Sequence, residues 1–240
     1  MGRAELWAII ARAAVGAVLG ASIVAPALAQ TAAEPPSLRA IELTLKVGYG
    51  LPLGHTGHRT SLGNQPLSDV VSYLVPIEVG AGYRFNSRFV AGLSVQYAFA
   101  SINDQVYPCL REDGLGCSSH GDLRVDANVI LHLGSGGRFD PWVGVGAGYE
   151  WLLLTFQTGA TRTDTLAGFE FANLQTGGYV KVAPGIAIGP FVGLSFGMYR
   201  TDSFGAFAPD MNPGMTTLIT PRSLHEWLVF GVGGTHDIHF

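Results

Sequence analysis

Apolar and polar side chains alternate with a period of two residues along most of the chain after residue 38. A period of two is typical of a β-strand, because successive side chains of a strand point to opposite faces. No segment after residue 38 shows the period of an amphipathic helix. The pattern predicts eight strands, at approximately 40–51, 71–85, 89–100, 122–134, 141–153, 176–188, 191–200 and 226–240.

The predicted connections alternate between long and short. Long connections cover residues 53–69, 101–121, 155–174 and 201–225, and short ones cover 86–88, 135–140 and 189–190. Long outer loops and tight periplasmic turns are typical of transmembrane barrels. Pro76 and Pro184 lie inside predicted strands, where each should cause a bulge or a missing hydrogen bond in the ladder.

The composition favours a membrane protein that crosses with strands. Hydrophobic residues make up 48% of the 240 residues and charged residues only 13%, whereas a soluble domain has about 25% charged residues. The only long apolar run lies at the N-terminus. The formal net charge of -4 argues against a nucleic acid partner, because it leaves no strongly basic surface.

Residues 1–29 have the pattern of a secretory signal peptide. Arg3 and Arg12 provide a basic start, residues 13–26 are apolar, and Ala27-Leu28-Ala29 matches a cleavage site. We expect cleavage after Ala29 and a flexible lead-in over residues 30–38, before the barrel domain at 39–240. The alternative is an uncleaved membrane helix, for which the apolar run is short.

Aromatic residues recur near the ends of the predicted strands, as in the two interfacial girdles of a membrane barrel. The last predicted strand ends at Phe240, which is similar to the C-terminal assembly signal of outer-membrane barrels. The predicted girdle residues are Tyr49, Tyr73, Tyr83, Phe85, Phe89, Tyr97, Phe99, Trp142, Tyr149, Trp151 and Trp227.

Residues 39–240 thus resemble the small outer-membrane barrels of the OmpA, OmpX and OmpW kind. The resemblance is architectural: no motif selects a subfamily, and no catalytic or binding residue carries over. It implies an all-β, eight-stranded antiparallel transmembrane β-barrel in the bacterial outer membrane. The expected partners are outer-membrane lipid and the barrel-assembly machinery, and the expected oligomeric state is a monomer.

Charged residues on the inward face of the predicted strands are the first candidates for chemistry. Folding about the connections places Lys46 near Glu78, and Arg124 near Glu150. One interpretation is a structural ion-pair network, which the inward glycines favour because they indicate a crowded interior. The other is a gated polar path. The eight inward charges are Glu42, Lys46, Glu78, Arg84, Arg124, Asp126, Glu150 and Lys181.

Cys109 and Cys117 share the second long connection. An exported protein matures where disulfides form, so we expect a local bridge that constrains this loop. A metal site is the alternative, but His120 alone does not complete a tetrahedral set with two cysteines.

No arrangement in the sequence holds a nucleophile against a base, and none predicts a metal site or a cofactor. The sequence therefore favours a non-enzymatic integral outer-membrane protein that acts through its outer loops. A narrow, porin-like channel for small or hydrophobic solutes is the first alternative. An enzyme acting on envelope lipids is the second.

Overall fold

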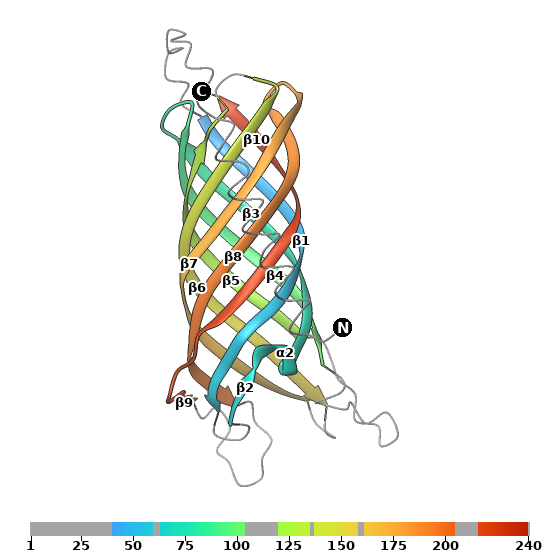
Figure 1. The fold of residues 1–240 in the computed structure, drawn as a ribbon, viewed down its shortest axis with the longest axis vertical. Helices are drawn as coiled ribbons and strands as arrows, with labels where there is room; N and C mark the ends of the chain where they lie inside the picture. The colour runs from blue at the N-terminus through green and yellow to red at the C-terminus, as the bar shows by residue number, and fades with distance from the viewer. Residues whose placement is uncertain are drawn as a thin grey trace, which may run out of the picture. The chain divides into compact units, whose positions relative to one another are not determined.

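Eight long strands form a closed antiparallel barrel in the computed structural model (Figure 1), as the alternation predicts. The structure describes residues 40–59, 63–103, 120–134, 137–157, 161–204 and 216–239. The barrel closes because β10 pairs with both β8 and β1. The eight strands are β1 (Ala40–Arg59), β3 (Val71–Arg84), β4 (Phe89–Ile102), β5 (His120–His132), β6 (Phe139–Gln157), β7 (Thr161–Ala183), β8 (Ile186–Phe204) and β10 (His225–His239).

The two ends of the barrel differ. One end, here called the turn end, carries the tight connections after β3, β5 and β7. The other, the loop end, carries the short strands β2 (Gly63–Pro66) and β9 (Thr216–Leu218) and the single-turn helix α2 (Leu67–Val70) (Figure 1). Among the described residues, no helix is long and apolar enough to cross a membrane. The predicted signal peptide and lead-in, Cys109, Cys117 and Phe240 lie outside the described residues.

The predicted turn at 86–88 is correct. The side chain of Asn86 accepts hydrogen bonds from the backbone N–H groups of Arg88 and Phe89, at 2.8 and 2.9 Å. These bonds hold the chain in a tight reversal between β3 and β4.

The predicted turn at Gly189-Pro190 is wrong. Both residues lie inside β8, and the chain reverses instead at Pro184-Gly185. Gly185 has a φ of +71°, which glycine adopts without steric cost, and proline favours the first turn position. Pro184 therefore belongs to a turn rather than to a strand.

Pro76 does lie inside a strand, β3. On the β1 side, the pairing passes directly from Val47–Ile77 to Gly50–Leu74, so the ladder is interrupted at Pro76. A missing ladder bond is the outcome expected for a proline, which has no backbone N–H to donate.

Two predicted long connections contain regular structure. The connection predicted at 155–174 is mostly strand, because β6 runs to Gln157 and β7 begins at Thr161. Similarly, β1 continues to Arg59 and pairs there with β2. The part of the 155–174 segment before Phe169 lies beyond the apolar belt and carries outward Thr155, Thr163 and Thr165, so the hydrophobic alternation that predicts a strand is lost there.

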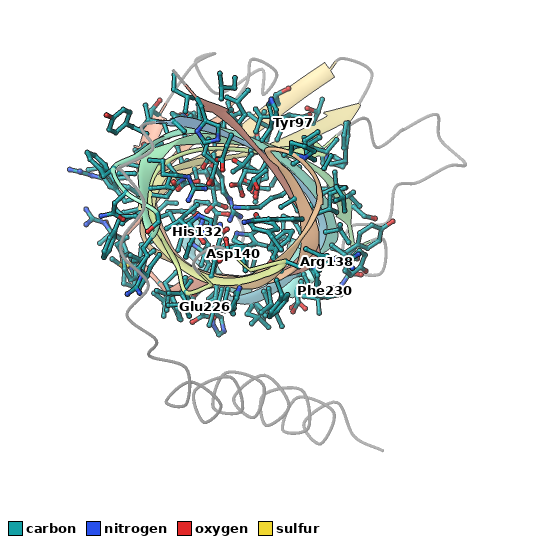
Figure 2. The ribbon with its side chains drawn as sticks, turned by 90° about the horizontal axis from the view of Figure 1, so that it is seen from above. Tyr97, His132, Arg138, Asp140, Glu226 and Phe230 are labelled. Atoms are coloured by element: carbon teal, nitrogen blue, oxygen red, sulfur yellow. The ribbon has the colours of Figure 1, made fainter. Side chains whose placement is uncertain are left out.

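Around the middle of the barrel the outward side chains are apolar and exposed. Leu93 is 64% exposed and Val145 53% exposed, and the same holds for outward residues on all eight strands. A continuous exposed apolar belt on a closed barrel is the surface that a lipid bilayer covers. Figure 2, viewed along the barrel, shows Tyr97 and Phe230 outside the ring of strands and His132 and Asp140 inside it.

Aromatic side chains border this belt on both sides. On the loop side, ring pairs join Tyr49 to Tyr73 and to Phe230, and Tyr149 to Trp151 and to Phe169, with centroids 4.6–5.6 Å apart. We call this set, with the Tyr97–Phe99 pair, the loop-side girdle. The turn-side girdle comprises Tyr83, Phe85, Phe89 and Phe139.

Beyond the loop-side girdle, the strands continue into a part here called the head, which includes β2, α2 and β9. Its interior combines apolar side chains with the buried carboxylates of Asp164 and Asp202. On β6, Leu152 and Leu154 share the inward face with Glu150, and all three are almost completely buried. The apolar side chains of the head that are at most 1% exposed are Leu67, Val71, Leu74, Leu152, Leu154, Leu166 and Ile219.

Candidate functional site

Buried charges fill the lumen at three levels, and the first lies at the turn end. Arg84 forms ion pairs with Glu42 and with Asp237, the latter at 3.1 Å. His132 lies between Glu42, at 3.3 Å from Nε2, and Asp140, at 2.7 Å from Nδ1. Because β1, β3, β5, β6 and β10 each contribute one of these side chains, the cluster ties five strands together across the lumen.

The second level surrounds Lys46 of β1. Its Nζ lies 2.9 Å from a carboxylate oxygen of Glu78 and donates to the side-chain oxygen of Gln175 at 2.6 Å. The same ammonium lies 5.4 Å from the ring centroid of Trp142 and 5.7 Å from that of Phe191, within cation–π range. A desolvated cation is therefore satisfied on several sides at the middle of the barrel.

The third level centres on Glu150 of β6, at the height of the loop-side girdle. Its Oε1 accepts hydrogen bonds from the Tyr199 hydroxyl at 2.6 Å and from Trp227 Nε1 at 3.0 Å. Its Oε2 lies 2.9 Å from Nε2 of His225, whose ring stacks on Tyr199 with centroids 4.0 Å apart. Arg124 Nη2 lies 3.6 Å from Oε1.

Arg124 links this carboxylate to the opposite wall. Its Nε donates to Asp122 at 2.8 Å, and its Nη1 donates to Glu170 at 3.3 Å and to Ser195 at 3.2 Å. The guanidinium carbon also lies 5.3 Å from the ring centroid of Trp227. We call the Glu150 and Arg124 side chains with these partners the Glu150 cluster.

Close approach of β5 and β6 holds the cluster in place. Gly148 faces inward, two residues before Glu150 on the same strand. A Cβ atom at Gly148 would lie 2.2 Å from both Asp126 Oδ1 and the backbone oxygen of Val125. A larger residue would therefore push the two strands apart and separate Arg124 from Glu150, which are partners in the register.

The structure brings together most of the inward charges singled out from the sequence. Lys46 meets Glu78, Arg124 meets Glu150, and Arg84 meets Glu42. Asp126 is buried beside them at the middle of the lumen.

Lys181 is the exception. It is exposed at the turn end of β7 and has no ion pair among the described residues. Parity assigns a side chain to a face, but it does not locate the point where the strand leaves the lumen.

Several lumen residues around Lys46 and in the Glu150 cluster were not singled out by the sequence. Trp142 and Trp227 were predicted in the girdles but are buried in the lumen, at 1% and 0% exposure. The alternation itself contains this signal, because both residues share parity with inward neighbours on their strands. Asp122 also shares the parity of Arg124, whereas Glu170 fell in a segment predicted to be a loop.

Among the cavities lined by described lumen residues, three have volumes of about 20, 10 and 10 Å³. Each has room for about one water molecule. Among the residues that the structure describes, no group of three or more His, Cys, Asp or Glu side chains is arranged to hold a metal ion.

No protein-family model matches the chain, and no curated protein matches it significantly. Solved structures do. The outer membrane protein OprG from Pseudomonas aeruginosa superposes with a TM-score of 0.51 at 11% identity, over 85% of this chain and 99% of that one. A major outer membrane protein from Thermus thermophilus gives 0.52 at 11% identity, over 83% and 100%. The chain has the fold of an outer-membrane β-barrel.

The outer membrane protease OmpT from Escherichia coli also matches, with a TM-score of 0.39 at 6% identity over 87% of this chain and 99% of that one. A likeness at that level carries no argument about activity.

The girdles agree with the outer-membrane barrel fold. On β1, Ile41 pairs with Tyr83 of the turn-side girdle, and Tyr49 belongs to the loop-side girdle. About nine residues separate these levels, close to the ~9–11 residues that a tilted strand needs to cross the hydrocarbon core. The Lys46 level therefore lies within the membrane-spanning part of the barrel, the Arg84 level lies at its turn-side boundary, and the Glu150 cluster lies at its loop-side boundary.

Proposed function

We propose that this protein is a non-enzymatic integral protein of the bacterial outer membrane, in which a filled barrel anchors an interaction surface formed by the head. The observation that carries the proposal is the closure of the lumen by three levels of buried ion pairs. The proposal also includes a monomeric state and insertion by the barrel-assembly machinery.

The distribution of apolar surface supports this placement. The exposed belt between the girdles needs hydrocarbon around it, whereas the head buries most of its large apolar side chains, with Leu218 and Leu224 as exceptions, and therefore suits water. In barrels of this fold the tight turns face the periplasm and the longer connections face outward. The head would then stand on the cell surface.

The contacts of the buried histidines support a non-enzymatic role. His132 lies between two carboxylates, and His225 contacts Glu150 and stacks on Tyr199. A histidine that activates a side-chain nucleophile needs a hydroxyl or thiol within hydrogen-bond reach. The hydroxyl of Ser195 instead accepts a hydrogen bond from Arg124.

The test is the conductance of the refolded mature barrel in a planar lipid bilayer, after heat-modifiable gel migration has verified folding. We expect a silent bilayer, with a general porin refolded in parallel as the positive control. Discrete and reproducible current steps from verified folded protein would contradict a filled lumen. They would establish the narrow-channel alternative, with the lumen charges as its selectivity elements.

The envelope-lipid enzyme is tested separately. Folded protein is incubated with labelled phospholipid and lipopolysaccharide, and the lipids are then analysed for cleaved or transferred groups. We expect unchanged lipids at every time point, and turnover would contradict the non-enzymatic role.

A further inference from the structure

The outward face of the head on β6, β7, β8 and β9 carries hydroxyl groups, with Leu218 of β9 exposed among them. Thr155 and Thr163 are cross-strand partners with their Oγ1 atoms 3.1 Å apart. Thr165 pairs with Ser203, whose Oγ lies 2.9 Å from Oγ1 of Thr216. We call this set the hydroxyl face.

The face continues directly into the apolar belt below it. Phe169 of β7 is 54% exposed, and Met198, its partner on β8, is 37% exposed. Both lie at the height of the loop-side girdle, because Phe169 packs against Tyr149 with ring centroids 5.0 Å apart. On these strands the outward surface therefore changes from apolar to hydroxyl-bearing within a few residues.

A β-bulge places a cation at this boundary. The pairing of β7 with β8 passes from Gly168–Tyr199 to Ala167–Thr201, so Arg200 is the extra residue. Bulges re-aim side chains, and the Arg200 side chain is exposed. Its backbone oxygen accepts a hydrogen bond from Ile219 at 2.9 Å, which fixes the bulge against the chain after β9. Arg200 forms no ion pair among the described residues.

We propose that this side of the barrel binds a phosphorylated glycolipid of the outer leaflet. Its acyl chains would lie against Phe169 and Met198, its phosphate against Arg200, and its sugars against the hydroxyl face. Guanidinium groups bind phosphate through charge-assisted, frequently bidentate hydrogen bonds. A phospholipid without sugars could contact Phe169 and Met198 with its acyl chains and Arg200 with its phosphate, but it has no sugar for the hydroxyl face.

This inference rests on the proposed function, because the head must face outward to meet such a lipid. The experiment is a titration of the refolded mature protein in detergent with purified lipopolysaccharide, with bound lipid counted by native mass spectrometry. We expect Arg200→Gln to weaken binding by about tenfold, because each charge-assisted hydrogen bond is worth about that factor. Arg138→Gln is the matched control, since Arg138 is an exposed arginine at the turn end and should not affect binding.

Two further measurements separate the parts of the surface. Lipopolysaccharide stripped of its phosphates should bind wild type and Arg200→Gln equally. The double variant Thr165→Val, Ser203→Ala should weaken binding of lipopolysaccharide by roughly threefold or more, with binding of phosphatidylglycerol unchanged. Heat-modifiable gel migration verifies that each variant is folded.

Two results would overturn the proposal. If folded Arg200→Gln bound lipopolysaccharide as tightly as the wild type does, Arg200 would not contact the phosphate. If the wild type bound phosphatidylglycerol as tightly as lipopolysaccharide, the hydroxyl face would not recognise sugar. A conducting lumen would contradict the proposed function and leave this binding result unaffected, so the two proposals fail separately.

Discussion

The membrane part of the barrel and the head are built from the same strands, yet they distribute apolar side chains differently. On β6, the inward face carries Glu150 at the girdle and Leu152 and Leu154 just beyond it, while the outward face changes from Val145 to Thr155. β6 itself runs unbroken through this change, from Phe139 to Gln157. The difference on this strand follows the surrounding solvent, because one fold carries both patterns.

The two parts are consequently stabilised in different ways. Lipid tails are as apolar as leucine, so the belt gains little by turning inward. The membrane part relies on paired charges and close packing in the lumen. The head meets water, so burial of its leucines contributes through the hydrophobic effect. The same kind of substitution should therefore change the free energy of unfolding by different amounts in the membrane part and in the head.

The largest effect is expected from Glu150→Gln. The substitution keeps the shape of the side chain but removes the negative charge that Arg124 faces and places an amide donor among donors from His225 and Trp227. Breaking a buried pair should lower the free energy of unfolding by roughly 4 kcal/mol. Urea titration of the barrel in lipid vesicles, followed by gel migration, measures the change. Glu226→Gln, at an outward and half-buried position, is the control, and equal stability of both variants would contradict the role of the cluster.

The next largest effect is expected in the head. Leu166 is fully buried, so Leu166→Ala removes packed apolar atoms and should cost about 3 kcal/mol in the same titration. Leu93→Ala on the belt should cost well under ~1 kcal/mol, because lipid replaces the lost contacts. If both leucines cost the same, the two parts would not differ as described.

The smallest effect tests the outward faces. Val145 lies near the middle of the belt, and Val145→Lys should lower the stability in lipid by about 2 kcal/mol. Thr165→Lys, outward on the head, should change it by at most ~0.5 kcal/mol. A penalty at Thr165 as large as at Val145 would mean that the bilayer extends over the hydroxyl face.

The alternation predicts the membrane part of the structure well. Eight strands, the turn at Asn86 and the neighbourhoods of Lys46 and Arg124 follow from parity and from folding about the connections. Parity works there because lipid demands an apolar side chain at nearly every outward position. Trp142 and Trp227 have inward parity, but they were predicted in the girdles because tryptophan is frequent at membrane interfaces. Parity alone would have placed both side chains correctly in the lumen.

The head was not predicted, and the reason is physical. Thr163 and Thr165 lie on the outward face of β7 beyond the girdle, and in sequence they look like the polar residues of a loop. Glu170, a partner of Arg124, lies in the same predicted connection, 155–174, and was therefore not predicted to face the lumen. The bulge between Glu170 and Ala172 also shifts the parity, so no simple count along β7 would have placed this carboxylate.

The length of β7 has a consequence for what approaches the cell. The strand has 23 residues, of which Thr161–Gly168 lie beyond the girdle and pair with β6 and β8. At about 3.3 Å per residue and a tilt of about 40°, this extension rises roughly 20 Å above the bilayer. With the head facing outward as proposed, a phage or an antibody would meet a stiff, hydrogen-bonded stalk at that height, and binding to it would cost little entropy of ordering.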